Sequence, residues 1–243
     1  MFSAISRVFR TPDLRRKILF TLGMIALYRL GTTIPAPHVN YANVQTCVDG
    51  MSVDGQTNLF SMLNLFSGGA LMQLSIFALG IMPYITASII VQLLTVVIPR
   101  FEELKKEGQS GQAKMTQYTR YLTVALALLQ SSGIVALADR EQLLGQGVPV
   151  LVEDRNLWTL AMMVIVMTSG AVLIMWLGEI ITEKGVGNGM SLLIFAGIAT
   201  RLPTDGANIL RQSGPVVFAV VIVAVILLVV GIVFIEQGQR RIP

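Results

Sequence analysis

The chain has 243 residues, of which 53% are hydrophobic and only 13% charged, with a mean hydropathy of +0.69 and a formal net charge of +4. Soluble globular domains carry about 25% charged residues, so this composition excludes an ordinary soluble domain. Six membrane-crossing helices of about 20 residues would use roughly 120 residues, which matches the hydrophobic supply. A single Cys47 and a single His38 exclude a disulfide scaffold and a Cys/His metal cluster. We therefore predict an all-α polytopic membrane protein without a metal site.

The N-terminal segment 1–17 is predicted to be a cytoplasmic amphipathic helix on the membrane surface. It carries five basic residues, and its apolar residues recur at helical spacing. Pro12, placed between a hydroxyl and an acidic residue, predicts the start of a second helix. The first membrane span then follows at 18–34, and Arg29 near its far end is expected to reach the membrane interface.

Five further apolar runs complete a predicted set of six transmembrane helices. They cover residues 74–98, 122–138, 157–181, 190–202 and 216–235. The run at 190–202 is short for a span, and the glycine-rich segment 185–189 in front of it is expected to lengthen it. With the N-terminus inside, 13 of the 18 Lys and Arg residues lie inside, while the 14 acidic residues divide equally. This is the positive-inside pattern, so the basic excess needs no nucleic-acid partner.

A short apolar segment lies between the first two spans. It covers residues 59–66 and is followed by Ser67, Gly68 and Gly69, a natural hinge. Eight residues cannot cross a bilayer, so the segment is interfacial or re-entrant. A re-entrant backbone is tolerated only where protein or a water-filled cavity surrounds it. From the residues alone, a re-entrant helix and a helix lying flat on the outer surface both remain open.

The centres of the second to sixth runs contain no Asp, Lys, Arg or His. Ion-coupled transporters and proton pumps mark their path with such groups, so this absence disfavours them. The polar residues at these centres are uncharged, and such residues predict hydrogen bonds between neighbouring helices. They are Thr86, Ser88, Gln92, Gln130 and Ser131. Pro83 in the second run predicts a kink.

Two strings resemble enzyme motifs, but the residues around them do not support an enzymatic role. The serine string at 108–111 lies in a charged loop, and no span offers a histidine base, which disfavours an intramembrane protease. The glycine string at 185–189 follows no predicted strand, and its Gly-x-x-x-Gly spacing instead favours close approach of helix backbones. We therefore predict no catalytic residue and no cofactor.

Two aliphatic pairs recur at helical spacing. Ile81 and Ile85 are four residues apart in the second run, and Met190 and Ile194 are four apart in the fifth. Each pair shares one helix face. By itself this spacing is typical of lipid-facing or helix-packing residues.

At these residues the chain resembles the SecY family, the central subunits of the bacterial protein-conducting channel. The matching strings are NLFSMLNLFSGGALMQLSIFALGIMPYITASIIVQLLTVVIP, EELKKEGQSGQAKMTQYTRYLT, MWLGEIITEKGVGNGMSLLIFAGI and EQGQRRIP. The resemblance implies a ten-helix, inverted-repeat channel with a lateral gate between its second and seventh helices. It also implies a short plug helix in the outer funnel and a ring of aliphatic side chains at the constriction.

Carried over by position, the resemblance implies four groups of site residues. The plug would comprise Leu59, Phe60, Met62, Leu63, Leu65 and Phe66, with Gly68 and Gly69 as its hinge. The pore ring would comprise Ile81, Ile85, Met190 and Ile194. The lateral gate would include Thr86, Ile89 and Gln92, and the cytoplasmic partner contact Lys105 and Lys106. Where the family commonly has isoleucine, Met190 keeps the ring apolar and makes it more flexible.

The resemblance also implies an organisation and a function. Residues 18–202 would form the first five-helix half with the plug at 59–69, residues 203–243 the sixth helix and the start of a cytoplasmic loop, and helices seven to ten would lie beyond Pro243. The channel would pass unfolded secretory proteins across the bacterial cell membrane and membrane segments laterally into it, as a multi-pass protein with a cytoplasmic N-terminus. Its partners would be the SecE and SecG subunits, the SecA motor or the ribosome, signal sequences, nascent polypeptides and the lipid bilayer. Half of a coupled small-solute transporter remains the alternative.

Overall fold

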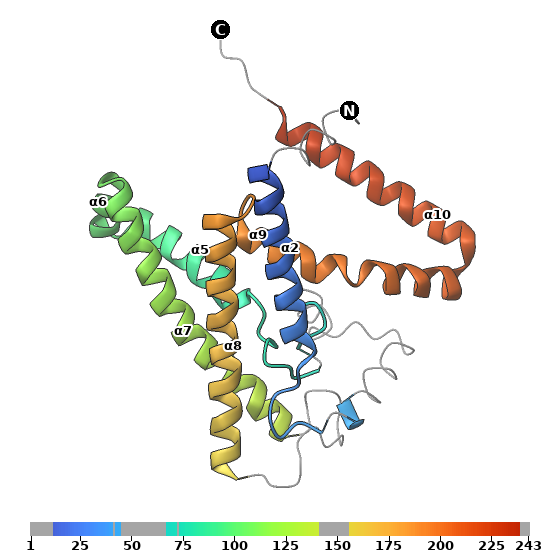
Figure 1. Cartoon of the computed structure of the whole chain (residues 1–243), viewed down its shortest axis with the longest axis horizontal. Helices are drawn as coiled ribbons and strands as arrows, with labels where there is room; N and C mark the ends of the chain where they lie inside the picture. Colours follow the sequence, from blue (N-terminus) through green and yellow to red (C-terminus); the bar gives the residue numbers. More distant parts are fainter. Residues whose placement is uncertain (1–11, 41, 45–66, 72, 141–155, 239–243) are drawn as a thin grey trace. The chain divides into compact units, whose positions relative to one another are not determined.

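The computed structural model describes residues 12–40, 42–44, 67–71, 73–140 and 156–238 (Figure 1). The chain divides into two compact units, residues 1–198 and 199–243, and each is described by itself. Within the described ranges the regular structure is helical, apart from an isolated bridge between Pro35 and Ser75. The predicted all-α class is therefore confirmed, while the amphipathic helix of residues 1–17 lies mostly outside the described residues.

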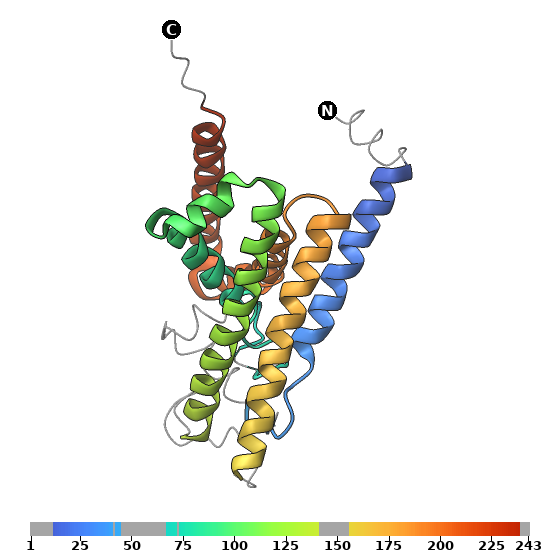
Figure 2. The same ribbon diagram turned by 90° about the vertical axis from the view of Figure 1, so that its left-hand side faces the viewer.

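The first unit is a bundle of helices in which α8 lies between α2 and α7 (Figure 2). The helices of this unit are α2 (Pro12–Thr33), α5 (Met82–Val97), α6 (Pro99–Lys106), α7 (Gln109–Asp139), α8 (Leu157–Lys184) and α9 (Gly189–Ala199), the last of which ends at the boundary between the units. As predicted, a helix, α2, begins at Pro12, whose fixed φ and missing N–H suit a helix start.

Among the described residues, three helices are long and apolar enough to cross a membrane. They are α7, α8 and residues 206–236 of α10. The pair α5 and α6 makes a fourth if it counts as one span, although the two helices are bent by 100° at their junction. α2 has the length of a span, since its 22 residues extend about 33 Å. The full number of six spans stays a prediction.

The second apolar run does not form one helix from residue 74 onward, so that part of the prediction is wrong. Residues 73–81 fold into consecutive turns, in which Leu74 and Gly80 have φ values of +45° and +56°. The helix begins only at Met82, with Pro83 in its first turn. The predicted kink at Pro83 is therefore also wrong, because a proline in the first turn has no intrahelical partner to lose.

The expected lengthening of the fifth run is wrong as well. Residues 185–188 form a bend, with Gly187 at φ +73°, and α9 starts only at Gly189. The 11 residues of α9 extend about 16 Å, which is shorter than the hydrocarbon core of a bilayer. The predicted close approach of helix backbones does occur here, because a Cβ on Gly189 would collide with the carbonyl oxygen of Gly178 in α8.

The second unit consists mainly of α10 (Leu202–Glu236). This helix contains the predicted run at 216–235, and its residues 206–236 are long and apolar enough to cross a membrane. The helix is interrupted at Gly214, which has a φ of +80° and precedes Pro215. A proline inside a helix removes a hydrogen bond and clashes with the preceding turn, which accounts for the break.

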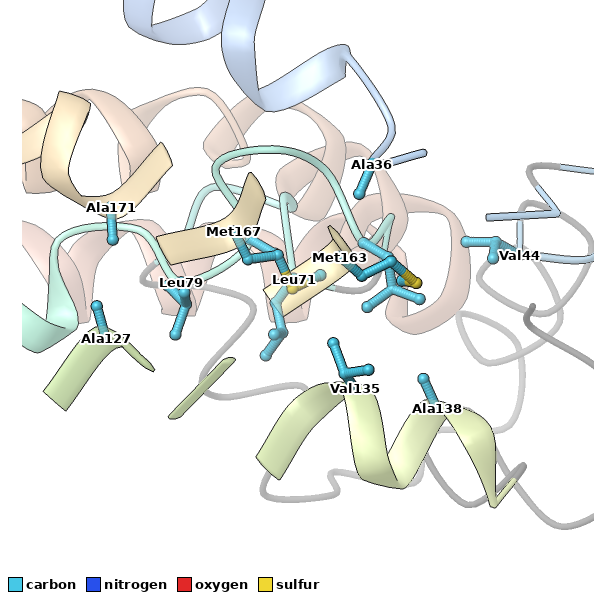
Figure 3. Packing of buried hydrophobic residues seen from close by; sticks show 12 residues of the cluster. Ala36, Val44, Leu71, Leu79, Ala127, Val135, Ala138, Met163, Met167 and Ala171 are labelled. Carbon is cyan, nitrogen blue, oxygen red and sulfur yellow. The ribbon is translucent and has the colours of Figure 1, made fainter. Parts of the chain in front are cut away.

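The larger core of the first unit lies between α7, α8 and the folded loop at 67–81 (Figure 3). Met163 and Met167 of α8 are fully buried in one cluster with Val135 of α7, and Leu71 and Leu79 from the loop lie between the two helices. Between membrane helices the packing of side chains, rather than exclusion of water, drives association. The loop is therefore an integral part of this core.

One of the predicted polar contacts joins two helices. The hydroxyls of Ser131 in α7 and Thr168 in α8 lie 2.9 Å apart and are buried. Thr86 instead donates to the carbonyl of Met82 within α5, and Gln92 donates to Ser88 in the same helix at 3.4 Å. Of these groups, only Ser131 makes a hydrogen bond between helices, which confirms part of that prediction.

Candidate functional site

The first unit contains a hollow with a volume of about 580 Å³ that we call the α5–α9 hollow. Side chains from four helices line it, and they include both apolar and polar groups. They are Tyr84, Ile85, Ser88 and Ile89 of α5, Thr116 and Arg120 of α7, Glu179, Thr182 and Glu183 of α8, and Asn188, Met190, Ser191 and Ile194 at α9. Such a surface accepts apolar and polar groups alike.

Three of the four predicted ring residues line this hollow. Ile85 and Ile194 are half-buried, and Met190 is 9% exposed. The fourth, Ile81, precedes the first residue of α5 and is only 5% exposed, because it packs into a second hydrophobic cluster with Phe77. The structure therefore brings Ile85, Met190 and Ile194 together and places Ile81 in the core beside them.

The position of α9 in the hollow is set by hydrogen bonds at its start. The Asn188 side chain accepts from the backbone N–H of Met190 at 3.0 Å, as an N-cap residue does. The Gly189 N–H donates to the Thr182 hydroxyl at 2.8 Å, and that hydroxyl donates to the Gly178 carbonyl. The Thr182 side chain of α8 therefore holds the backbone at the start of α9. This contact orients Met190 and Ile194 toward the hollow.

The predicted gate residues lie on α5. Ile89 lines the α5–α9 hollow and is 51% exposed, whereas Gln92 lines a neighbouring hollow of about 390 Å³ between α5, α6 and α7. Lys105, predicted as a partner contact, lines that same second hollow. Gln92 and Lys105, which sequence reasoning assigned to different roles, therefore share one surface.

The other predicted partner contact, Lys106, is paired within α6. Its ammonium lies 2.8 Å from the Glu102 carboxylate one turn earlier, and both side chains are largely exposed. The hydrogen bond from Lys106 lowers the pKa of Glu102, and the same bond raises the pKa of Lys106. An exposed pair of this kind contributes little to stability.

The predicted plug residues 59–66 lie outside the described residues, whereas Gly68 and Gly69, predicted to form the hinge, lie within them. Gly68 and Gly69 are buried and have φ values of +67° and +96°, a conformation that glycine adopts without strain. The guanidinium of Arg29 donates to the Gly68 carbonyl at 3.0 Å. Because a charged donor forms a strong hydrogen bond, this contact ties the far end of α2 to the loop.

Sequence reasoning missed one pair of site residues. Arg120 and Glu179 both line the α5–α9 hollow and form an ion pair. They are 59 positions apart on different helices, so no periodic pattern connects them. The signal that was available is their shared position near the ends of two adjacent apolar runs.

Two solved structures share this fold. "Sec61 in the Canine ribosome-channel complex from the endoplasmic reticulum" superposes with a TM-score of 0.59 at 18% identity, covering 93% of this chain and 49% of that chain. "The structure of a protein conducting channel" gives the same TM-score and identity, covering 93% of this chain and 48% of that chain. Apolar helices arranged around a hollow in this way define an α-helical, multi-pass membrane protein with the fold of a protein-conducting channel.

Sequence comparisons identify the family. The SecY family model matches residues 75–243. The protein translocase subunit SecY of Corynebacterium glutamicum is 72% identical over 241 residues, which cover 99% of this chain and 54% of that relative. The corresponding subunit of Mycobacterium tuberculosis is 60% identical over 244 residues, covering 100% and 55%. The chain belongs to the SecY family and spans about half the length of the curated relatives that it matches.

Proposed function

We propose that this chain is the N-terminal half, plus the sixth helix, of the pore-forming subunit of a protein-conducting channel. The channel passes unfolded secretory proteins across the bacterial cell membrane and releases membrane segments sideways into lipid. The observation that carries this proposal is the α5–α9 hollow, where Ile85, Met190 and Ile194 meet in a chain of the SecY family. The channel itself catalyses no reaction, and a partner supplies the energy.

The ring side chains act by excluding water and by yielding to the polypeptide. An apolar constriction that is narrow enough to lose its water blocks ions without a charge. Ile85, Met190 and Ile194 supply the part of this ring that belongs to the chain, and Ile81 supports it from the core. Aliphatic contacts are individually weak and have no directional demand, so they part around many different polypeptides.

The remaining site residues take roles around this ring. The segment 59–66 is the plug, and Gly68 and Gly69 are its hinge. Thr86, Ile89 and Gln92 form one wall of the lateral gate, which signal sequences enter. The plug role rests on the family resemblance, and the positive φ values of Gly68 and Gly69 support their role as its hinge.

The partners follow from the same assignment. SecE and SecG are the companion subunits, and Lys105 and Lys106 contact the SecA motor or the ribosome on the cytoplasmic side. The canine Sec61 protein belongs to a ribosome–channel complex, which supports a ribosome contact for this chain. The exposed positions of Lys105 and Lys106 on α6 suit an electrostatic contact with an acidic or nucleic-acid partner surface, without readout of base sequence.

A translocation assay tests the proposed function. The completed channel is this chain followed by the part of the Corynebacterium glutamicum relative that lies beyond the match, reconstituted with SecE and SecG. With SecA and ATP, vesicles containing it should protect an unfolded secretory precursor from added protease. This chain alone should insert into the vesicles but protect no precursor, because it supplies only one of the two walls of the gate. Absence of protection in vesicles with the completed channel, under conditions where the Corynebacterium glutamicum protein is active, would contradict the proposal.

Thiol labelling tests the proposed orientation in the membrane. In a Cys47→Ser background, Lys105→Cys on α6 should react with an impermeant maleimide from the cytoplasmic side. Leu157→Cys, at the first residue of α8, should react only from the opposite side, since α7 crosses the membrane between them. Reaction of both cysteines from one side would show that this arrangement is wrong.

A further inference from the structure

α7 and α8 are joined by a two-point ion pair between Arg120, in the first half of α7, and Glu179, near the end of α8. Nε of Arg120 donates to Oε1 of Glu179 at 2.9 Å, and Nη2 donates to Oε2 at 2.8 Å. Two parallel hydrogen bonds between a guanidinium and a carboxylate fix the orientation of both groups as well as their separation. Nη1 of Arg120 also donates to the Gln117 side chain at 3.3 Å, which holds the guanidinium from its own helix.

A second polar contact joins α7 and α8 in the same register as the ion pair. The buried hydroxyls of Ser131 and Thr168 also connect α7 with α8. Eleven residues separate Arg120 from Ser131, and eleven separate Thr168 from Glu179, or about 16 Å along each helix. The two helices are antiparallel neighbours (Figure 2), so equal spacing means that sliding one along the other would break both contacts.

The ion pair also lies between two hollows. On one side is the α5–α9 hollow, and on the other is a hollow of about 380 Å³ along the outer face of α8, which we call the α7–α8 hollow. Arg120, Glu179 and Glu183 line both of them, and of these the first two form the ion pair. Apart from these charged groups, the α7–α8 hollow is lined by Val172, Met175, Trp176 and Ile180, and Trp176 is 55% exposed.

We propose that Arg120 and Glu179 are positioning residues that fix the register of α7 against α8 and close the wall between the two hollows. The Glu179 side chain is only 20% exposed, so loss of its partner leaves a poorly solvated charge that draws water into the wall. The two hollows would then become continuous. This inference rests on the proposed function in one respect, namely that the α5–α9 hollow is the water-filled side.

The test measures whether water reaches Val172, in the completed channel with the Cys47→Ser background. Val172 packs against the second hydrophobic cluster, so a Val172→Cys thiol should react slowly with a charged maleimide, because the thiolate forms only where water has access. Arg120→Gln or Glu179→Gln should increase the labelling rate several-fold. The charge swap Arg120→Glu with Glu179→Arg should return the rate toward that of the parent, which a purely steric role would not do.

Leu128→Cys on α7 is the matched control. Leu128 is 53% exposed, and the register of the two helices places it at nearly the same depth as Val172. Its labelling should not change. Unchanged labelling at Val172→Cys, equal acceleration at Leu128→Cys, or a charge swap that labels as fast as the single variants would each overturn the proposal. Because labelling requires no translocation, a channel that fails to translocate contradicts the proposed function and leaves this result readable.

Discussion

Replacing Ile85 with asparagine is expected to raise the resting ion conductance of the completed channel several-fold. Ile85 lines the α5–α9 hollow opposite Met190 and Ile194, where an amide group would hold water that an aliphatic side chain excludes. Conductance across planar bilayers, compared at equal amounts of inserted protein, measures the effect. The substitution should change stability little, because Ile85 is only half-buried.

Two matched variants show whether the leak belongs to the hollow. Leu93→Asn lies on the same helix but is 62% exposed and lines no part of the hollow, so it should leak much less. Ile81→Asn should mainly destabilise the protein, by about 1–3 kcal/mol for an unpaired buried polar group alone, because Ile81 packs in the core. Equal conductance of the Ile85 and Leu93 variants would remove the case for a ring at Ile85.

Replacing Gly189 with alanine is expected to separate α9 from α8. A Cβ on Gly189 would collide with the carbonyl oxygen of Gly178 and lie 2.8 Å from the Cβ of Ile181. Backbone atoms cannot turn aside as a flexible side chain can, so α9 must move. Overpacking of this kind costs about 1–3 kcal/mol, and it would displace Met190 and Ile194 from the hollow. Thermal unfolding in detergent measures the loss.

Two other glycines provide graded controls for this experiment. A Cβ on Gly178 would meet the end of the Met190 side chain, which can rotate away, so Gly178→Ala should cost less than Gly189→Ala. Gly133 in α7 has open space around it, and Gly133→Ala should stabilise the helix by roughly 0.5–1 kcal/mol. If Gly189→Ala unfolds at the same temperature as Gly133→Ala, the proposed backbone contact does not limit the packing of α9.

Several features of the site could be predicted from the sequence because they depend on local spacing. Met190 and Ile194 share one face of α9, and the same spacing selected Ile85 on α5. The Gly-x-x-x-Gly string likewise predicted a close backbone approach, which occurs at Gly189. Composition and the lengths of the apolar runs were sufficient for the all-α membrane class, because each membrane helix satisfies its own backbone hydrogen bonds.

The tertiary structure decided the features that depend on contacts between distant segments. Helical spacing could not show that Ile81 is buried, because the turns before α5 follow from the packing of residues 73–81 between α7 and α8. It could not show that Arg29 reaches Gly68, which lies 39 positions away, or that Arg120 pairs with Glu179.

The sequence by itself therefore determined the class of the protein, the positions of its long apolar helices and the shared helix face of Met190 and Ile194. These properties arise from local hydrophobicity and helical period, which neighbouring residues set. Only the folded bundle decided that α5 and α9 line one hollow, and that Arg120 and Glu179 lie in its wall. Those contacts depend on which helices pack together and in what register, and the register is set jointly by side chains far apart in the chain.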